Sequence, residues 1–164
     1  MEIEELAKRV AIALMDKNYK IVTAEECTAG LVGAAIASQD YAQRWYKGTT
    51  VVYDEETAIN VLDVADYTIK RNDFVSPQVV SQMALTALKK FNVNICLAIN
   101  GYVDGYGSTD VPAGEVQLCT AKFGVGGNVK FRYKAIKVKS KDRGKNIEEC
   151  IKEALILIME TVVE

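Results

Sequence analysis

The chain has 164 residues, of which 49% are hydrophobic and 26% are charged, and its formal net charge is −2. This length and balance are typical of a folded protein with one core, so we expect a single domain over residues 1–164. No apolar run approaches the roughly 18 residues that a membrane helix needs, which argues against a membrane protein. The basic residues are scattered along the chain, which argues against nucleic acid as a partner.

The start of the chain and its cysteines indicate a reducing compartment. Glu2, Glu4 and Glu5 precede any apolar run, whereas a secretory signal begins with basic residues and continues into an apolar centre. The four cysteines form no C-x-x-C pair, and there is no histidine to complete a zinc site. We therefore expect a cytoplasmic protein with buried thiols and with neither a metal nor another cofactor. Without histidine, a general base has to be a lysine, a tyrosine or a carboxylate.

The first part of the chain predicts helices that alternate with short strands. Apolar residues recur at spacings of three and four near the start, which predicts a helix. A β-branched apolar run then predicts a buried strand, and Thr28 is suited to cap the helix that follows it. The predicted elements are, in order, helix 2–17, strand 20–24, helix 28–38, short helix 41–46, a turn at Gly48, strand 49–53 and helix 55–62.

The second part of the chain adds one well-defined helix, a buried strand and a hairpin. Ser76-Pro77 is a strong helix start, with serine as the cap and proline at the first helical position. The continuous apolar run 93–99 predicts a strand covered on both faces, and a glycine-rich loop follows it. The last predicted elements are strands 115–123 and 128–138, joined as an antiparallel hairpin, and helix 147–162. This order predicts a three-layer α/β/α sandwich with a mixed β-sheet.

Three segments follow predicted strands, at the place where open α/β sheets bind their ligands. Thr23–Gly30 reads Thr-Ala-Glu-Glu-Cys-Thr-Ala-Gly, Tyr53–Ala58 reads Tyr-Asp-Glu-Glu-Thr-Ala, and Asn100–Gly114 is rich in glycine. They resemble three motifs of the CinA C-terminal domain family, the nicotinamide mononucleotide deamidases. The first two family motifs are Thr-Ala-Glu-Ser-Cys-Thr-Gly-Gly and Tyr-Ser-Asn-Glu-Ala-Lys, and the similarity extends over nearly the whole chain.

The resemblance implies an amide hydrolysis that this chain has lost. The family uses the serine of the first motif as nucleophile and the lysine of the second as its base, and these positions are Glu26 and Ala58 here. We therefore expect a catalytically degenerate domain that keeps a site for a small nucleotide. The resemblance assigns the catalytic positions to Glu26, Tyr53 and Ala58, and ligand binding to Glu25, Thr28, Ala29, Gly30, Asn100, Gly101, Asp104, Gly105, Gly107 and Arg143.

Two alternatives stay open. One is an active amidohydrolase in which Glu26 or Tyr53 activates a water molecule, and a strongly raised pKa of Glu26 would favour it. The other is an interaction or scaffold domain, and hydrophobic strand edges suggest a homo-oligomer. Simpler roles are also possible, because an acid near a helix N-terminus is favoured by the helix dipole and a tyrosine at a strand end often only packs. Glu25 and Glu26 would also repel an anion at that helix.

Overall fold

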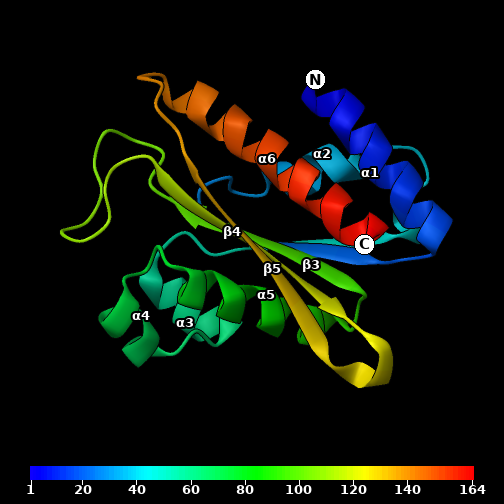
Figure 1. Ribbon diagram of the computed structural model, residues 1–164, viewed down its shortest axis with the longest axis horizontal. Helices are drawn as coiled ribbons and strands as arrows, with labels where there is room; N and C mark the ends of the chain where they lie inside the picture. Colours follow the sequence, from blue (N-terminus) through cyan, green and yellow to red (C-terminus); the bar gives the residue numbers. More distant parts are fainter.

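The computed structural model describes residues 1–164 as a five-stranded mixed sheet between two layers of helices (Figure 1). The strand order is β2-β1-β3-β4-β5, with β1 parallel to β2 and β3 and the pairs β3-β4 and β4-β5 antiparallel. This confirms the predicted fold class. The elements are α1 (Ile3–Lys17), β1 (Ile21–Glu25), α2 (Leu31–Ala37), η1 (Ala42–Arg44), β2 (Tyr46–Val51), α3 (Glu55–Leu62), α4 (Asp66–Asn72), α5 (Pro77–Phe91), β3 (Ile95–Gly101), β4 (Glu115–Phe123), η2 (Val125–Gly127), β5 (Val129–Lys137) and α6 (Arg143–Val163).

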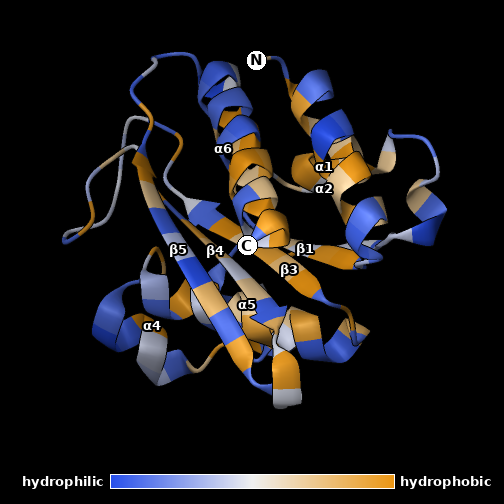
Figure 2. Cartoon of the chain, turned by 45° about the vertical axis from the view of Figure 1, so that its right-hand side comes forward, coloured by the Kyte–Doolittle hydropathy of each residue, from blue (hydrophilic) through white to orange (hydrophobic).

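The two faces of the sheet carry separate apolar cores. Helices α1, α2 and α6 cover one face around a cluster of 25 buried residues, and α3, α4 and α5 cover the other around a cluster of 18 (Figure 1). The central strands β1 and β3 are buried throughout, whereas β5 alternates between more and less exposed residues. Hydrophilic and hydrophobic residues correspondingly alternate along β5 (Figure 2). None of the helices combines the length and apolar character needed to cross a membrane. The edge strands are β2 and β5, and self-association through them stays an expectation.

The sheet brings the three predicted strand-end segments together at one end of its strands, the carboxyl end of β1, β2 and β3. Parallel strands end on the same side, and the register pairs Glu25 of β1 with Val51 of β2 and with Ile99 of β3. The residues that follow these three positions therefore meet, although they are far apart in the sequence. This is the arrangement that the order of strands and loops predicts.

The carboxyl group of Glu25 fastens α2 to the end of β1. Glu25 is fully buried, and its oxygens accept hydrogen bonds from the backbone N–H groups of Val32 (3.0 Å) and Gly33 (2.9 Å). The hydroxyls of Thr23 (2.7 Å) and Thr28 (2.6 Å) donate to the same carboxyl. Two of the N–H groups that a helix start leaves without partners are thereby satisfied from outside the helix.

This arrangement corrects the predicted start of α2. The helix begins at Leu31 rather than Thr28, and its N-cap is Gly30, whose φ is 92°. The Thr28 hydroxyl donates to Glu25 and caps nothing. Ala29 also has a positive φ of 48°, a conformation that costs an L-residue with a Cβ about 1–2 kcal/mol. The turn at Ala29 and Gly30 is therefore strained, and the hydrogen bonds that Glu25 accepts help to keep it in this conformation.

Helix α2 lies unusually close to β2. A Cβ added to Gly33 would stand 2.0 Å from Thr49 Oγ1 and 2.8 Å from Tyr46 Oη, so only glycine fits there. Thr49 shares hydrogen bonds with Tyr46 (2.5 Å) and with Thr23 (2.7 Å). A continuous polar chain therefore connects β2, β1 and the Glu25 carboxyl.

Three other local predictions were wrong. Gly48 lies inside β2 rather than at a turn, where the register slips by one residue against β1. Helix α4 was not predicted, because Asp66–Asn72 has no apolar stripe and buries only Thr68 and Ile69. Helix α6 starts at Arg143 rather than residue 147, because the Asp142 carboxyl caps the Lys145 N–H and allows a polar first turn.

We predict that Glu25→Ala lowers the free energy of unfolding by about 3–5 kcal/mol, because it leaves two N–H groups and two hydroxyls buried without their acceptor. Urea denaturation measures the loss, and Glu4→Ala at an exposed position of α1 is the control, with an expected change within about 0.5 kcal/mol. A loss below about 1 kcal/mol for Glu25→Ala would show that α2 does not depend on this carboxyl.

Candidate functional site

A cavity of about 330 Å³ opens at the edge of the sheet where the three segments meet. It combines residues that follow β1, β2 and β3 with the first residue of α6 and with the segment before α5. We call it the Glu26 cavity. Its lining consists of Glu26, Tyr53, Asp54, Glu55, Phe74, Val75, Gly101, Tyr102, Val103, Asp104, Tyr106 and Arg143.

Glu26 is the most deeply placed acid of this cavity. Its backbone N–H donates to the Ile99 carbonyl (3.0 Å), and its Oε1 accepts from the Gly101 N–H (2.9 Å), so β3 holds it at both ends. Only 8% of the residue is exposed. Burial raises the pKa of Glu26 from 4.5 to about 7, against the opposing effects of the Gly101 hydrogen bond and the Arg143 charge. Near neutral pH both protonation states are populated, which suits a group that takes up and returns a proton.

Tyr53, Asp104 and Arg143 form a polar cluster on the other side of the cavity. Arg143 Nη1 forms an ion pair with Asp104, and Nη2 donates to the Tyr53 hydroxyl at 2.5 Å. These residues come from the segment after β2, the loop after β3 and the start of α6. The fold thus joins three residues that were each predicted to belong to the site.

Ala58, which the sequence motif predicted to stand at the position of a catalytic lysine, does not line the cavity. It lies in the first turns of α3, fully buried in the core beneath the sheet. The first turn of the same helix does reach the cavity through Glu55, next to the capping residue Asp54. Position 58 therefore offers neither a proton acceptor nor an opening to the ligand space.

Of the residues that the sequence assigned to ligand binding, some line a cavity and the others support the fold around it. Gly101, Asp104 and Arg143 line the Glu26 cavity, and Gly105 lines a neighbouring one. The remainder are absent from the lining of the Glu26 cavity: Glu25 and Thr28 support α2, Ala29 and Gly30 form its turn, Asn100 donates from Nδ2 to the Phe74 carbonyl, and Gly107 packs against the Val111 carbonyl.

Cys27 is buried and takes no part in the cavity. A hydrogen bond with Cys150 and its own burial raise the pKa of the Cys27 thiol well above its usual value. A thiol that stays protonated is a poor nucleophile. The prediction that the four cysteines are buried thiols is confirmed.

The sequence did not single out several lining residues. Asp54 and Glu55 lie within the second motif, but only Tyr53 and Ala58 were selected from it. Phe74 precedes the Ser76-Pro77 helix start rather than following a strand, so the strand-end rule cannot find it. Four carboxyl groups and one guanidinium group line the cavity with four aromatic rings, and no cluster of three or more acidic or cysteine side chains is placed to hold a metal ion.

Comparisons with known proteins give one family. The CinA C-terminal domain family matches residues 3–162. The nicotinamide-nucleotide amidohydrolase PncC of Escherichia coli is 32% identical over 122 residues, which are 73% of this chain and 73% of that protein. A putative competence-damage inducible protein of Halothermothrix orenii is 34% identical over 126 residues, 76% of this chain but only 30% of that protein. This chain spans about a third of the length of that relative and of several others.

Solved structures agree with this result. The competence damage-inducible protein A of Klebsiella pneumoniae superimposes with a TM-score of 0.91 at 27% identity, over 100% of this chain and 99% of that chain. A competence/damage inducible protein of Agrobacterium tumefaciens gives 0.89 at 27% identity, over 100% and 97%. The whole fold, including both helical layers, is shared with these proteins.

The raised pKa of Glu26 predicts a specific pH dependence of stability. The folded chain holds a proton between pH 4.5 and 7 that the unfolded chain has released, so this group's contribution to stability falls as the pH rises through that window. Glu26→Gln removes the effect. Relative to wild type, we expect the variant to gain about 2–3 kcal/mol more in free energy of unfolding at pH 8 than at pH 5.

Urea denaturation at both pH values measures this difference, and Glu4→Gln serves as the exposed control. A Glu26→Gln effect that is the same at pH 5 and pH 8 would contradict the raised pKa.

Proposed function

The chain belongs to the CinA C-terminal domain family, and on that premise we propose that it binds a pyridine nucleotide in the Glu26 cavity without Ser-Lys amidase chemistry. The supporting observation is the fate of the two family positions. Glu26, which the motif resemblance aligns with the family's serine, lines the cavity, and Ala58, which it aligns with the family's lysine, lies buried in the core. A carboxylate is a much weaker acyl-transfer nucleophile than an activated alkoxide, and alanine accepts no proton.

The lining of the cavity supports binding of a flat, positively charged ring. Tyr53, Phe74, Tyr102 and Tyr106 supply aromatic surface, and aromatic faces attract cations. Asp54 and Glu55 add acidic side chains to the lining, and Glu26 adds a further negative charge in its ionised state. A nicotinamide nucleotide carries its positive charge on the pyridinium ring, which matches this surface.

Glu26 also supports a second candidate, an amide hydrolysis with a different base. The pKa of about 7, raised by burial, leaves a carboxylate able to accept a proton at neutral pH. In that reaction the carboxylate takes a proton from water, the hydroxide attacks the amide carbonyl, and the protonated carboxyl returns the proton to the departing ammonia. The Tyr53 hydroxyl and Arg143 guanidinium are the donors available to the negative oxygen of the intermediate.

The first test measures ammonia released from nicotinamide mononucleotide. If the Ser-Lys chemistry is absent and not replaced, wild type and Glu26→Gln release none above background, and Glu26→Ser gains no activity, because no lysine lines the cavity. Circular dichroism checks that the variants fold, because Glu26 is buried. If wild type turns over about 1 s⁻¹ or more and Glu26→Gln abolishes this activity, the proposal of a domain without catalysis is overturned and the second candidate is established.

The second test measures binding by calorimetry. We expect wild type to bind nicotinamide mononucleotide and Arg143→Ala to bind it at least about tenfold more weakly, because the guanidinium orients Tyr53 and is the one cation of the cavity. Arg9→Ala, on an exposed face of α1, is the control. Absence of binding by the wild type would contradict the proposed function.

A further inference from the structure

A second cavity of about 440 Å³ shares a wall with the Glu26 cavity. Val103, Asp104 and Arg143 line both, so the two spaces meet at the Asp104–Arg143 ion pair. The remaining wall comes from the end of β5, the segment that leads into α6, and the glycine-rich loop after β3. We call this space the lysine cavity, because Lys137, Lys139 and Lys141 line it.

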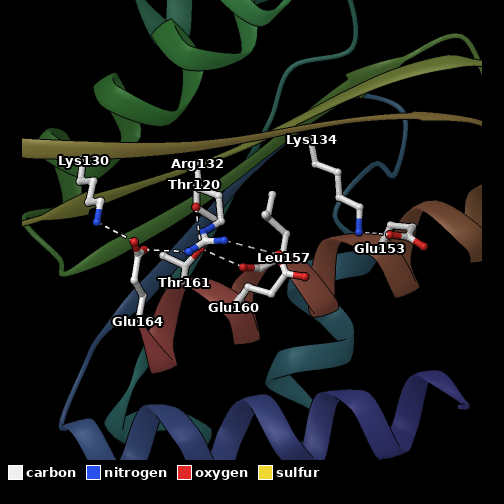
Figure 3. Close-up of polar contacts among 9 residues, drawn as sticks. All are labelled: Thr120, Lys130, Arg132, Lys134, Glu153, Leu157, Glu160, Thr161 and Glu164. Carbon is white, nitrogen blue, oxygen red and sulfur yellow. Dashed lines mark hydrogen bonds and ion pairs between the residues drawn. The ribbon is translucent and has the colours of Figure 1, made fainter.

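These three lysines have no ionic partners. Earlier in β5, by contrast, each lysine and arginine forms an ion pair with a glutamate of α6 (Figure 3). The pairs are Lys130–Glu164, Arg132–Glu160, Arg132–Glu164 and Lys134–Glu153. Lys137, Lys139 and Lys141 form no ion pair within the chain, and the single carboxylate of their cavity, Asp104, is already paired with Arg143. Glu115 lies opposite Lys137 in the register of β4 and β5, but its carboxyl accepts a hydrogen bond from Gln117 and forms no ion pair with the lysine. The cavity therefore has more unpaired positive than unpaired negative side chains in its lining.

The Glu26 cavity has the opposite charge. Four carboxyl groups line it, and its only cation is Arg143, which Asp104 neutralises. A phosphate group placed there would be repelled by the carboxylates of Asp54 and Glu55. The same group would be attracted on the other side of the Asp104–Arg143 pair. The two cavities thus suit the two ends of one ligand with a cationic ring and an anionic tail.

We infer that the lysine cavity is a phosphate subsite, which receives the phosphate of a nucleotide whose ring lies in the Glu26 cavity. This inference rests on the proposed function and names the part of the chain that selects a phosphorylated ligand over its nucleoside. Lysine acts here as a flexible point charge for phosphate, and a concentration of such charges also speeds the approach of an anion. The contacts are partly exposed, so their contribution weakens as salt is added.

The test compares a nucleotide with its nucleoside on matched variants. Calorimetry measures the binding of nicotinamide mononucleotide and of nicotinamide riboside, which lacks the phosphate. The test variant is Lys137→Gln, Lys139→Gln, Lys141→Gln. The control removes the same charge from exposed lysines elsewhere, in Lys8→Gln, Lys17→Gln, Lys89→Gln.

We expect the test variant to bind the nucleotide at least about tenfold more weakly and to bind the nucleoside within about twofold of wild type. The nucleotide affinity of wild type should also fall between 50 and 300 mM salt more steeply than that of the test variant. Equal losses in the test and control variants, or equal losses for nucleotide and nucleoside, would overturn the inference.

Inorganic pyrophosphate separates failure of this inference from failure of the proposed function. If wild type binds neither nucleotide nor nucleoside, the proposed function fails. In that case pyrophosphate tests the anion subsite on its own. The subsite is supported if wild type and the control variant bind pyrophosphate and the test variant does not. It is overturned if wild type does not bind pyrophosphate, or if the test variant binds it as well as wild type does.

Discussion

The hydrogen bonds that Glu25 accepts fix the geometry on which the site depends. Its carboxyl holds the first turn of α2 against the end of β1, and the threonines of β1 and β2 extend the same polar chain. Glu25 is thereby directed under α2, while the next residue, Glu26, enters the cavity and meets the Gly101 N–H. Two adjacent glutamates consequently lie in different surroundings, one holding α2 to the end of β1 and the other lining the cavity.

A separation of charge organises the rest of this edge of the molecule. The acids of α6 form ion pairs with the cations in the first and middle part of β5, and Arg143 at the start of α6 contacts Asp104 in the loop after β3 and Tyr53. The lysines between these two regions, Lys137, Lys139 and Lys141, form no ion pairs. Acidic and aromatic surface therefore lies on one side of the Asp104–Arg143 pair and basic surface on the other.

Local patterns predicted the layers, the hairpin and the meeting of the three strand-end segments, because apolar periodicity and parallel strand direction determine them. They did not predict which member of the Glu25-Glu26 pair is structural, since that depends on where α2 starts and on its close approach to β2 at Gly33. The pKa of Glu26 depends on its burial and on an opposing hydrogen bond from Gly101, which lies 75 residues away in the sequence. Helix α4 was missed because it buries too few residues to leave an apolar stripe in the sequence.

The central claim is that Glu26 is a buried, titrating acid at the base of a ligand cavity. Carbon-13 NMR of the glutamate side-chain carboxyls tests it directly, with the Glu26→Gln variant assigning the signal. The account predicts a carboxyl that titrates near pH 7 and whose chemical shift moves when nicotinamide mononucleotide is added. A Glu26 signal that titrates near its ordinary value of 4.5 and does not respond to the nucleotide would contradict it.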